Sequence, residues 1–155
     1  MPESATAPAP GGKEYQLVLE RLLPAPPERV FDAWVNPETL VRWWGPEGFV
    51  TPELSLDVNE NGRWRTVMQA PNGDRHIVSG RYVKIDRPGL LRFTWAWEDP
   101  DGTRSVESEV ELTFRAAGNG THLQLTHRKI ATSDSRDSHR EGWLSSLDEL
   151  AKLFA

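Results

Sequence analysis

Alternation of hydrophobic and polar residues marks most of the chain between residues 49 and 130 as β-strands. The segment 104–114 shows this most clearly, because its apolar side chains share one side and its glutamates share a solvated side (Val106, Val110, Leu112 and Phe114 against Glu107, Glu109 and Glu111). A period of two is typical of a strand with one buried face. Asn-Gly and Pro-Gly pairs between the segments indicate tight turns. The pattern predicts an antiparallel meander, with strands over residues 14–23, 49–58, 63–70, 76–85, 90–97, 104–114 and 121–130.

The last part of the chain has a helical period instead. Over residues 133–155, apolar side chains recur every three or four positions, at Trp143, Leu147, Leu150 and Phe154. A sheet that is apolar on one face needs a cover, and this is the only long helix that the sequence predicts. We therefore expect the sheet to wrap around this helix.

Two short helices are expected between the first and second strands. Residues 28–35 place their hydrophobic side chains on one face after a proline-rich break. Asn36 and Pro37 then form a cap and a first-turn proline for a second helix over residues 37–44. We expect the first strand to pair with the last. The prediction is an α+β fold, with a curved antiparallel sheet of six or seven strands around a long C-terminal helix.

The strand over residues 76–85 is the least regular. Ile77 and Ile85 share a parity with Arg81, which predicts that the Arg81 side chain lies on the inner face of the sheet. Gly80 indicates a bulge in the same strand.

Composition and charge restrict the classes of partner. The formal net charge is −5 at pH 7, which argues against nucleic acids and anionic membranes. No apolar run approaches the roughly 18 residues of a membrane span, and the N-terminus lacks a signal-peptide pattern, which favours a cytoplasmic location. Residues 1–13 are rich in Pro, Ala, Ser and Gly and are expected to form a disordered tail. Residues 14–155 are expected to form a single domain.

The sequence contains no recognisable catalytic or cofactor motif. There is no Cys, no Gly-x-Ser-x-Gly motif and no glycine-rich phosphate loop. The histidines do not have the spacing of metal ligands (His76, His122, His127 and His139). We therefore expect neither a metal nor another cofactor, and we assign no catalytic residue.

Several stretches of the chain resemble one protein family. These stretches are LERLLPAPPERVFDAWVNPETLVRWWGPEGF, NGRWRTVMQAPNGD, GRYVKIDRPGLLRFTW and HREGWLSSLDELAKLF. They are similar to the Aha-type family, domains that resemble the C-terminal domain of the activator of the heat-shock chaperone ATPase, within the START and SRPBCC superfamily. The resemblance extends from about residue 14 to the C-terminus and implies a helix-grip fold. The superfamily includes lipid carriers, hormone receptors, polyketide cyclases and co-chaperone domains, so the fold alone does not define a function.

A helix-grip fold implies a cavity between the curved sheet and the long helix. Parity predicts that the cavity is lined by apolar and aromatic side chains, namely Trp64, Met68, Phe93, Trp95, Val110, Leu112, Leu125 and Trp143. The polar groups expected to reach the same space are Arg81, His127 and His139. Gly142, in the middle of the helix, indicates either a close strand or room for a ligand. In the alternative interpretation, the large side chains fill the space and each histidine is a hydrogen-bonded packing residue.

The sequence favours a protein that binds a small hydrophobic or aromatic molecule in this cavity. One alternative is a cyclase- or hydrolase-like enzyme that uses Arg81 and the histidines as acid, base or oxyanion partner. Another is a co-chaperone-like module that binds a chaperone through its surface. The expected partners are therefore a small hydrophobic molecule or a chaperone, and neither a nucleic acid nor a membrane.

Overall fold

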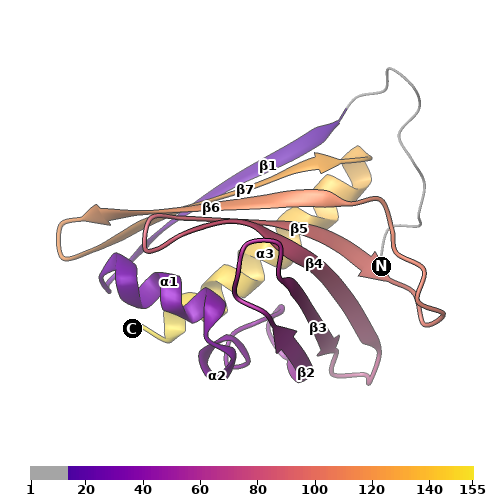
Figure 1. Ribbon diagram of the computed structural model, residues 1–155. Helices are drawn as coiled ribbons and strands as arrows, with labels where there is room; N and C mark the ends of the chain where they lie inside the picture. Colours follow the sequence, from indigo (N-terminus) through magenta and orange to yellow (C-terminus); the bar gives the residue numbers. More distant parts are fainter. Residues whose placement is uncertain (1–13) are drawn as a thin grey trace.

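The computed structural model describes residues 14–155, so the expected tail over residues 1–13 lies outside the described part. The described part contains seven strands and three helices (Figure 1). Their bounds are β1 (Tyr15–Leu23), α1 (Pro27–Val35), α2 (Pro37–Leu40), β2 (Val50–Leu56), β3 (Arg63–Gln69), β4 (Arg75–Asp86), β5 (Leu90–Glu98), β6 (Ser108–Ala117), β7 (Gly120–Ile130) and α3 (Ser133–Lys152).

The strands form one antiparallel sheet in the order β1-β7-β6-β5-β4-β3-β2. The first strand pairs with the last, as predicted. In this pair Leu19 lies opposite Leu125. The sheet curves over α3, and α1 and α2 lie near the C-terminal end of that helix (Figure 1). The expected helix-grip fold is therefore confirmed.

The short helices follow the expected signals, although α2 is shorter than predicted. Pro27 occupies the first turn of α1, and the side chain of Asn36 caps α2 by accepting a hydrogen bond from the Glu38 backbone N–H at 3.0 Å. A helix was expected over residues 37–44, but the regular part of α2 ends at Leu40. Beyond that residue the backbone continues as turns, in which the Trp43 N–H bonds the Leu40 carbonyl at 3.2 Å.

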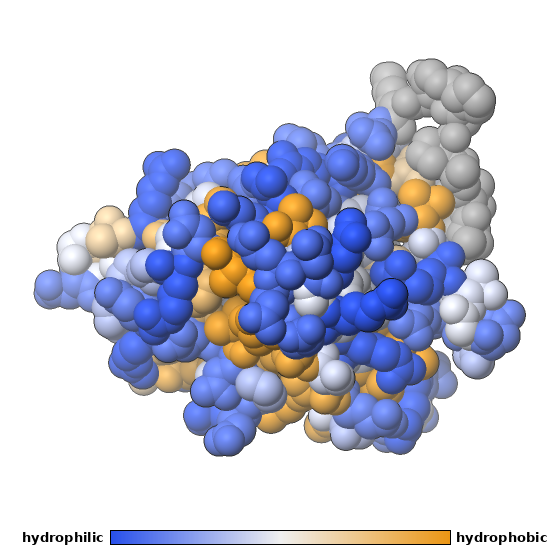
Figure 2. Space-filling model, viewed as in Figure 1, coloured by the Kyte–Doolittle hydropathy of each residue, from blue (hydrophilic) through white to orange (hydrophobic). Residues whose placement is uncertain are grey.

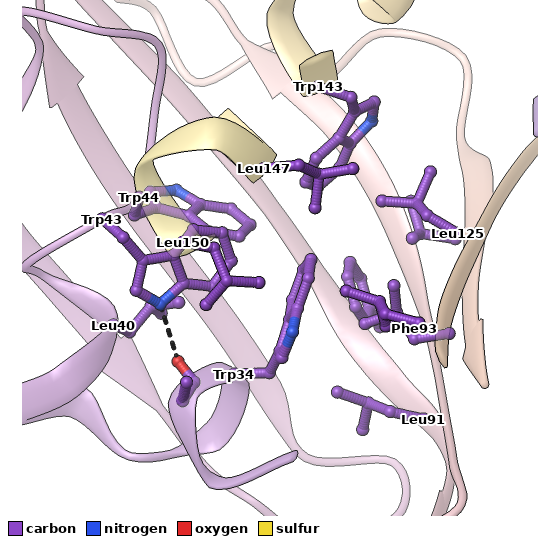
Figure 3. Close-up of a cluster of buried hydrophobic side chains, with 14 of the residues drawn as sticks. Trp34, Leu40, Trp43, Trp44, Leu91, Phe93, Leu125, Trp143, Leu147 and Leu150 are labelled. Atoms are coloured by element: carbon purple, nitrogen blue, oxygen red, sulfur yellow. Dashed lines mark hydrogen bonds between the residues drawn. The ribbon is translucent and has the colours of Figure 1, made fainter. Parts of the chain in front are cut away.

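Tryptophan rings form the centre of the core. Trp34 from α1 meets Trp43 at 4.6 Å between ring centroids, and Trp143 from α3 at 5.9 Å (Figure 3). Trp44 meets Trp143 at 5.8 Å, nearly edge to face, a geometry that aromatic rings prefer. Of the seven tryptophans, all except Trp97 are buried. The excess of tryptophan therefore fills most of the space between α3 and the sheet.

Arg81 does not face the interior, so this prediction was wrong. Its side chain is exposed on the outer face of β4, while its neighbour Tyr82 is buried. The pairing of β4 with β5 shifts register between Tyr82 and Lys84. An extra residue in a strand moves the side chains that follow it to the opposite face. Ile85, after the shift, therefore packs inward, whereas odd-numbered residues before the shift, such as Arg81, do not.

Two other surface expectations also need correction. The alternation along residues 49–58 predicts Val50 on the same face as Leu54 and Leu56. Val50 is exposed instead, because β2 shifts register against β3 between Val50 and Glu53. Glu111 does not belong to a purely solvated face, since its carboxylate lies 2.6 Å from the Arg92 guanidinium on the neighbouring strand.

The surface is polar over most of the face shown in Figure 2, where hydrophobic side chains gather in a band near the centre and the lower edge. Within residues 14–155, no helix is both long and apolar enough to cross a membrane.

His127 is a polar side chain that is completely buried in this core. Trp143 Nε1 donates a hydrogen bond to His127 Nδ1 at 3.1 Å, so the proton of the neutral imidazole lies on Nε2. His127 Nε2 then donates to Ser108 Oγ at 2.7 Å, and the Ser108 hydroxyl donates to the Trp95 carbonyl at 3.3 Å. Burial, with a smaller contribution from nearby His139, holds the pKa of His127 well below its usual range.

We predict that acid destabilises the protein through His127. The unfolded chain binds a proton near the usual histidine pKa of about 6.5, whereas the folded chain does not. This contribution to stability is complete above that pH and is lost as the pH falls below it, by up to about 1.4 kcal/mol per pH unit. Urea denaturation at a series of pH values between about 7.5 and 5.5 measures the slope.

His127→Gln should be less stable at neutral pH and should have a flatter pH dependence, because glutamine does not titrate. Leu125→Val is the matched control, since it weakens the same strand and keeps the histidine. Equal slopes for the two variants would contradict the assignment to His127.

Candidate ligand-binding cavity

A cavity of about 130 Å³ lies between α3, the inner faces of β3 and β5, and the loop that follows α2. Most of its walls are apolar or aromatic. The lining residues are Trp44, Gly45, Pro46, Met68, Trp95, Trp97, Ser138, His139, Gly142, Trp143 and Ser146. Ser138 is exposed and Pro46 is half-buried, so the cavity reaches the surface between the loop and α3.

The loop after α2 is held against the cavity by local geometry. Gly45 has a φ of +96°, a conformation that side chains disfavour. A Cβ atom at this glycine would lie 3.2 Å from Met68 Sδ in the opposite wall. The Glu47 backbone N–H donates to Ser145 Oγ at 2.9 Å, which ties the loop to α3. The loop and the helix therefore form a connected rim.

One face of α3 forms the other side of the cavity. His139, Gly142, Trp143 and Ser146 share this face because they recur every three or four residues. A Cβ atom at Gly142 would meet no heavy atom within 4 Å. Of the two interpretations of this glycine, the structure favours room in the cavity over a close strand.

The histidine in the wall is hydrogen-bonded through both ring nitrogens. Trp97 Nε1 donates to His139 Nε2 at 3.1 Å, so a neutral ring carries its proton on Nδ1. His139 Nδ1 lies 2.7 Å from the Ser135 carbonyl, one turn earlier in α3, and donates to it. The His139 ring lies 4.7 Å from that of His127, centroid to centroid. Each histidine accepts a hydrogen bond from a tryptophan through one ring nitrogen and bonds a further group through the other, which suits a packed role.

Trp95 carries an unpaired polar atom in the wall. Its Nε1 is buried without a hydrogen-bond partner among the described residues. A buried donor without a partner costs about 1–3 kcal/mol and calls for an explanation. Because this atom has almost no accessible surface, it does not face the cavity, although other atoms of the Trp95 ring do.

The predicted lining residues fall into separate groups. Met68, Trp95, His139 and Trp143 line the cavity. Trp64 and Phe93 border a separate void of about 20 Å³ on the inner side of the sheet.

The remaining predicted residues do not line the cavity. Val110, Leu112, Leu125 and His127 lie in the fully buried core and do not border the cavity. The rings of Trp34 and Trp143 pack against each other in the same core (Figure 3). Arg81 lies outside, on the opposite face of the sheet.

Several lining residues were missed in the sequence. Trp97 has the same strand parity as Trp95, and Ser146 lies two turns after His139 on α3, so periodicity could have indicated both. No periodic signal places Gly45 and Pro46 there, because a loop has none.

The described residues show no metal-ligand cluster. Within residues 14–155, no three His, Asp or Glu side chains lie close enough together to hold a metal ion. The hydroxyls of Ser138 and Ser146 line the cavity, whereas the nitrogens of His139 are bonded to Trp97 and to the helix backbone.

Solved structures have the same fold. The AHSA1 protein from Silicibacter pomeroyi is 36% identical, with a TM-score of 0.83 over 89% of this chain and 96% of that one. A protein from Chromobacterium violaceum is 29% identical, with a TM-score of 0.81 over 90% of this chain and 96% of that one. CalU16 from Micromonospora echinospora is 25% identical, with a TM-score of 0.70 over 96% of this chain and 82% of that one.

No curated protein matches this chain. The family model described as Activator of Hsp90 ATPase homolog 1-like protein matches residues 24–155, which include every element from α1 to α3. Together with the fold, this match confirms the resemblance seen in the sequence: the chain belongs to the Activator of Hsp90 ATPase homolog 1-like family, within the START and SRPBCC superfamily.

Proposed function

We propose that this protein binds a small aromatic or similarly apolar molecule in the cavity between α3 and the sheet. The observation that carries the proposal is a void of about 130 Å³ with largely aromatic walls. Such a void in a core that is otherwise filled by tryptophan costs packing energy. A ligand that fills it restores those contacts.

The volume limits the ligand to about one ring. An apolar cavity of about 150 Å³ holds benzene, whereas sites for drug-sized ligands measure about 300–1,000 Å³. The cavity of about 130 Å³ belongs to the first class. Lipids and polycyclic molecules therefore do not fit unless side chains move.

The Ser138 and Ser146 side chains in the lining support a ligand with one hydrogen-bond acceptor. Phenol or acetophenone should therefore bind more tightly than toluene, by up to about tenfold if the hydrogen bond adds about 1 kcal/mol. Binding is favoured over catalysis because His139 already uses both ring nitrogens within the protein.

We predict that small aromatic molecules stabilise the protein and that Gly142→Leu abolishes this effect. A ligand at about 100 times its Kd adds about 2.7 kcal/mol to the free energy of unfolding. Leucine at Gly142 would occupy the space that the glycine leaves open, while its higher helix propensity protects the fold. Calorimetric titration with toluene, phenol and acetophenone, together with thermal unfolding, measures both effects.

Glu141→Leu is the matched control for this experiment. It adds the same side chain to the preceding residue of α3, which is exposed and does not line the cavity. Binding should survive in this variant. Undiminished binding by Gly142→Leu would place the ligand elsewhere and refute the proposed site.

We also predict that Trp143→Ala changes the size of ligand that is accepted. This substitution removes a nearly buried ring from the cavity wall and should cost about 3–5 kcal/mol of stability. Two-ring molecules such as naphthalene should then bind better than toluene. Competition calorimetry with naphthalene and toluene, on the original protein and on Trp143→Ala, measures this preference.

Trp43→Ala serves as the control, because Trp43 is equally buried but does not line the cavity. It should lose stability without a change in preference. The same shift in both variants would mean that general loosening of the core, and not the cavity wall, determines ligand size.

A further inference from the structure

A second feature lies on the outer face of the sheet, away from the cavity. Arg63 on β3 and Arg81 on β4 are directly opposite each other in the strand pairing, and both are exposed. Opposite residues in an antiparallel pair have Cβ atoms about 4.5–5.5 Å apart. Side chains of like charge that lie directly opposite each other destabilise the sheet. This pair therefore has an energetic cost that the fold does not require.

Neither arginine has a counter-ion in the described part of the chain. Within residues 14–155, the guanidinium groups of Arg63 and Arg81 make no ion pair or hydrogen bond. The outer face is arranged differently on β5 and β6, where Arg92 lies opposite Glu111 and pairs with it at 2.6 Å. A glutamate on the neighbouring strand thus neutralises the outward-facing Arg92, whereas no carboxylate pairs with Arg63 or Arg81 in the described part of the chain.

The two arginines lie in a hollow and not on a flat surface. A groove of about 620 Å³ includes both residues, and the connection from β5 to β6 forms one of its walls. This wall is fixed in place, because the Arg104 guanidinium donates to the Ser79 carbonyl at 3.0 Å and to Ser79 Oγ at 3.1 Å. Ser55 and Asn61 add polar side chains to the lining.

The groove is positively charged in an acidic protein. It contains four arginines and two glutamates, an excess of two positive charges, whereas the whole chain carries −5 (Arg63, Arg65, Arg81 and Arg104 against Glu98 and Glu107). Arg65 pairs with Glu98 at 3.3 Å, and Arg104 with Glu107 at 3.2 Å. The excess therefore comes from the unpaired Arg63 and Arg81.

We infer that this groove binds a small molecule with a multiply charged oxyanion, held between Arg63 and Arg81. A guanidinium group binds phosphate or carboxylate oxygens through two parallel hydrogen bonds. Two adjacent guanidinium groups suit a dianion, which also removes the repulsion between them. Phosphate esters and polycarboxylates share this chemistry, and the site is independent of the cavity on the inner face.

The test uses pyrophosphate and citrate as probes at low ionic strength, where screening is weak. Either anion should raise the melting temperature and shift backbone amide signals of β3 and β4 in a titration followed by NMR. In the double variant Arg63→Gln/Arg81→Gln, the Kd should rise at least about tenfold. Without an anion, this variant should be as stable as the original protein or more stable, because the repulsion is gone.

Arg115→Gln is the control, because Arg115 is an exposed arginine on the outer face of β6, outside the groove. It should leave the affinity within about twofold, since screening limits the effect of a distant charge. A response to pyrophosphate alone would identify a phosphate site, and a response to citrate alone a carboxylate site. The inference is overturned if neither anion binds, or if the double variant binds both as tightly as the original protein.

Discussion

The packing of the Trp143 ring against three other indoles holds this fold together. Trp143 lies 5.2 Å from Trp95 on β5, 5.9 Å from Trp34 on α1 and 5.8 Å from Trp44 after α2, measured between ring centroids. Each buried ring removes about 150–250 Å² from water, which corresponds to an upper limit of about 4–6 kcal/mol. One side chain of α3 thus joins three segments that are distant in the sequence. Leu147 and Leu150 extend the same buried stripe of α3 over the sheet.

The same contact sets the size and the character of the cavity. The indoles occupy most of the space under the sheet, and room remains where Gly142 has no side chain. Trp97 and Trp143 each donate their N–H to a histidine, His139 and His127 respectively. These bonds fix the orientation of the rings. The result is a small pocket with largely aromatic walls.

The sequence predicted the fold well because the fold follows from periodicity. The alternation along β5 placed Phe93 and Trp95 inward, and the helical spacing placed His139 and Trp143 toward the sheet, as the structure confirms. The prediction for Arg81 was wrong because its direction was inferred from Ile85, and a register shift between the two residues places their side chains on opposite faces of β4.

The cavity itself was less predictable from the sequence. Periodicity states which residues face inward, but it does not state how far each ring extends. Val110 and Leu125 point in the predicted direction, yet both are completely buried in the core cluster that contains Trp34 and Trp143, and neither borders the cavity. Figure 3 shows Leu125, Trp34 and Trp143 within this cluster. The loop residues Gly45 and Pro46 were not predicted to line the cavity, because their place depends on tertiary contacts alone.

The aromatic cluster also constrains how such a protein can diversify. Because Trp143 touches rings from three other segments, its replacement changes the surroundings of all of them, and such neighbouring substitutions are not additive. A change of ring at this position therefore costs stability that changes at neighbouring positions must restore. Ser138 and Gly142 at the rim have no such partners in the cluster and can vary one at a time. The rim should therefore tolerate single substitutions, while the rings beneath it should change together.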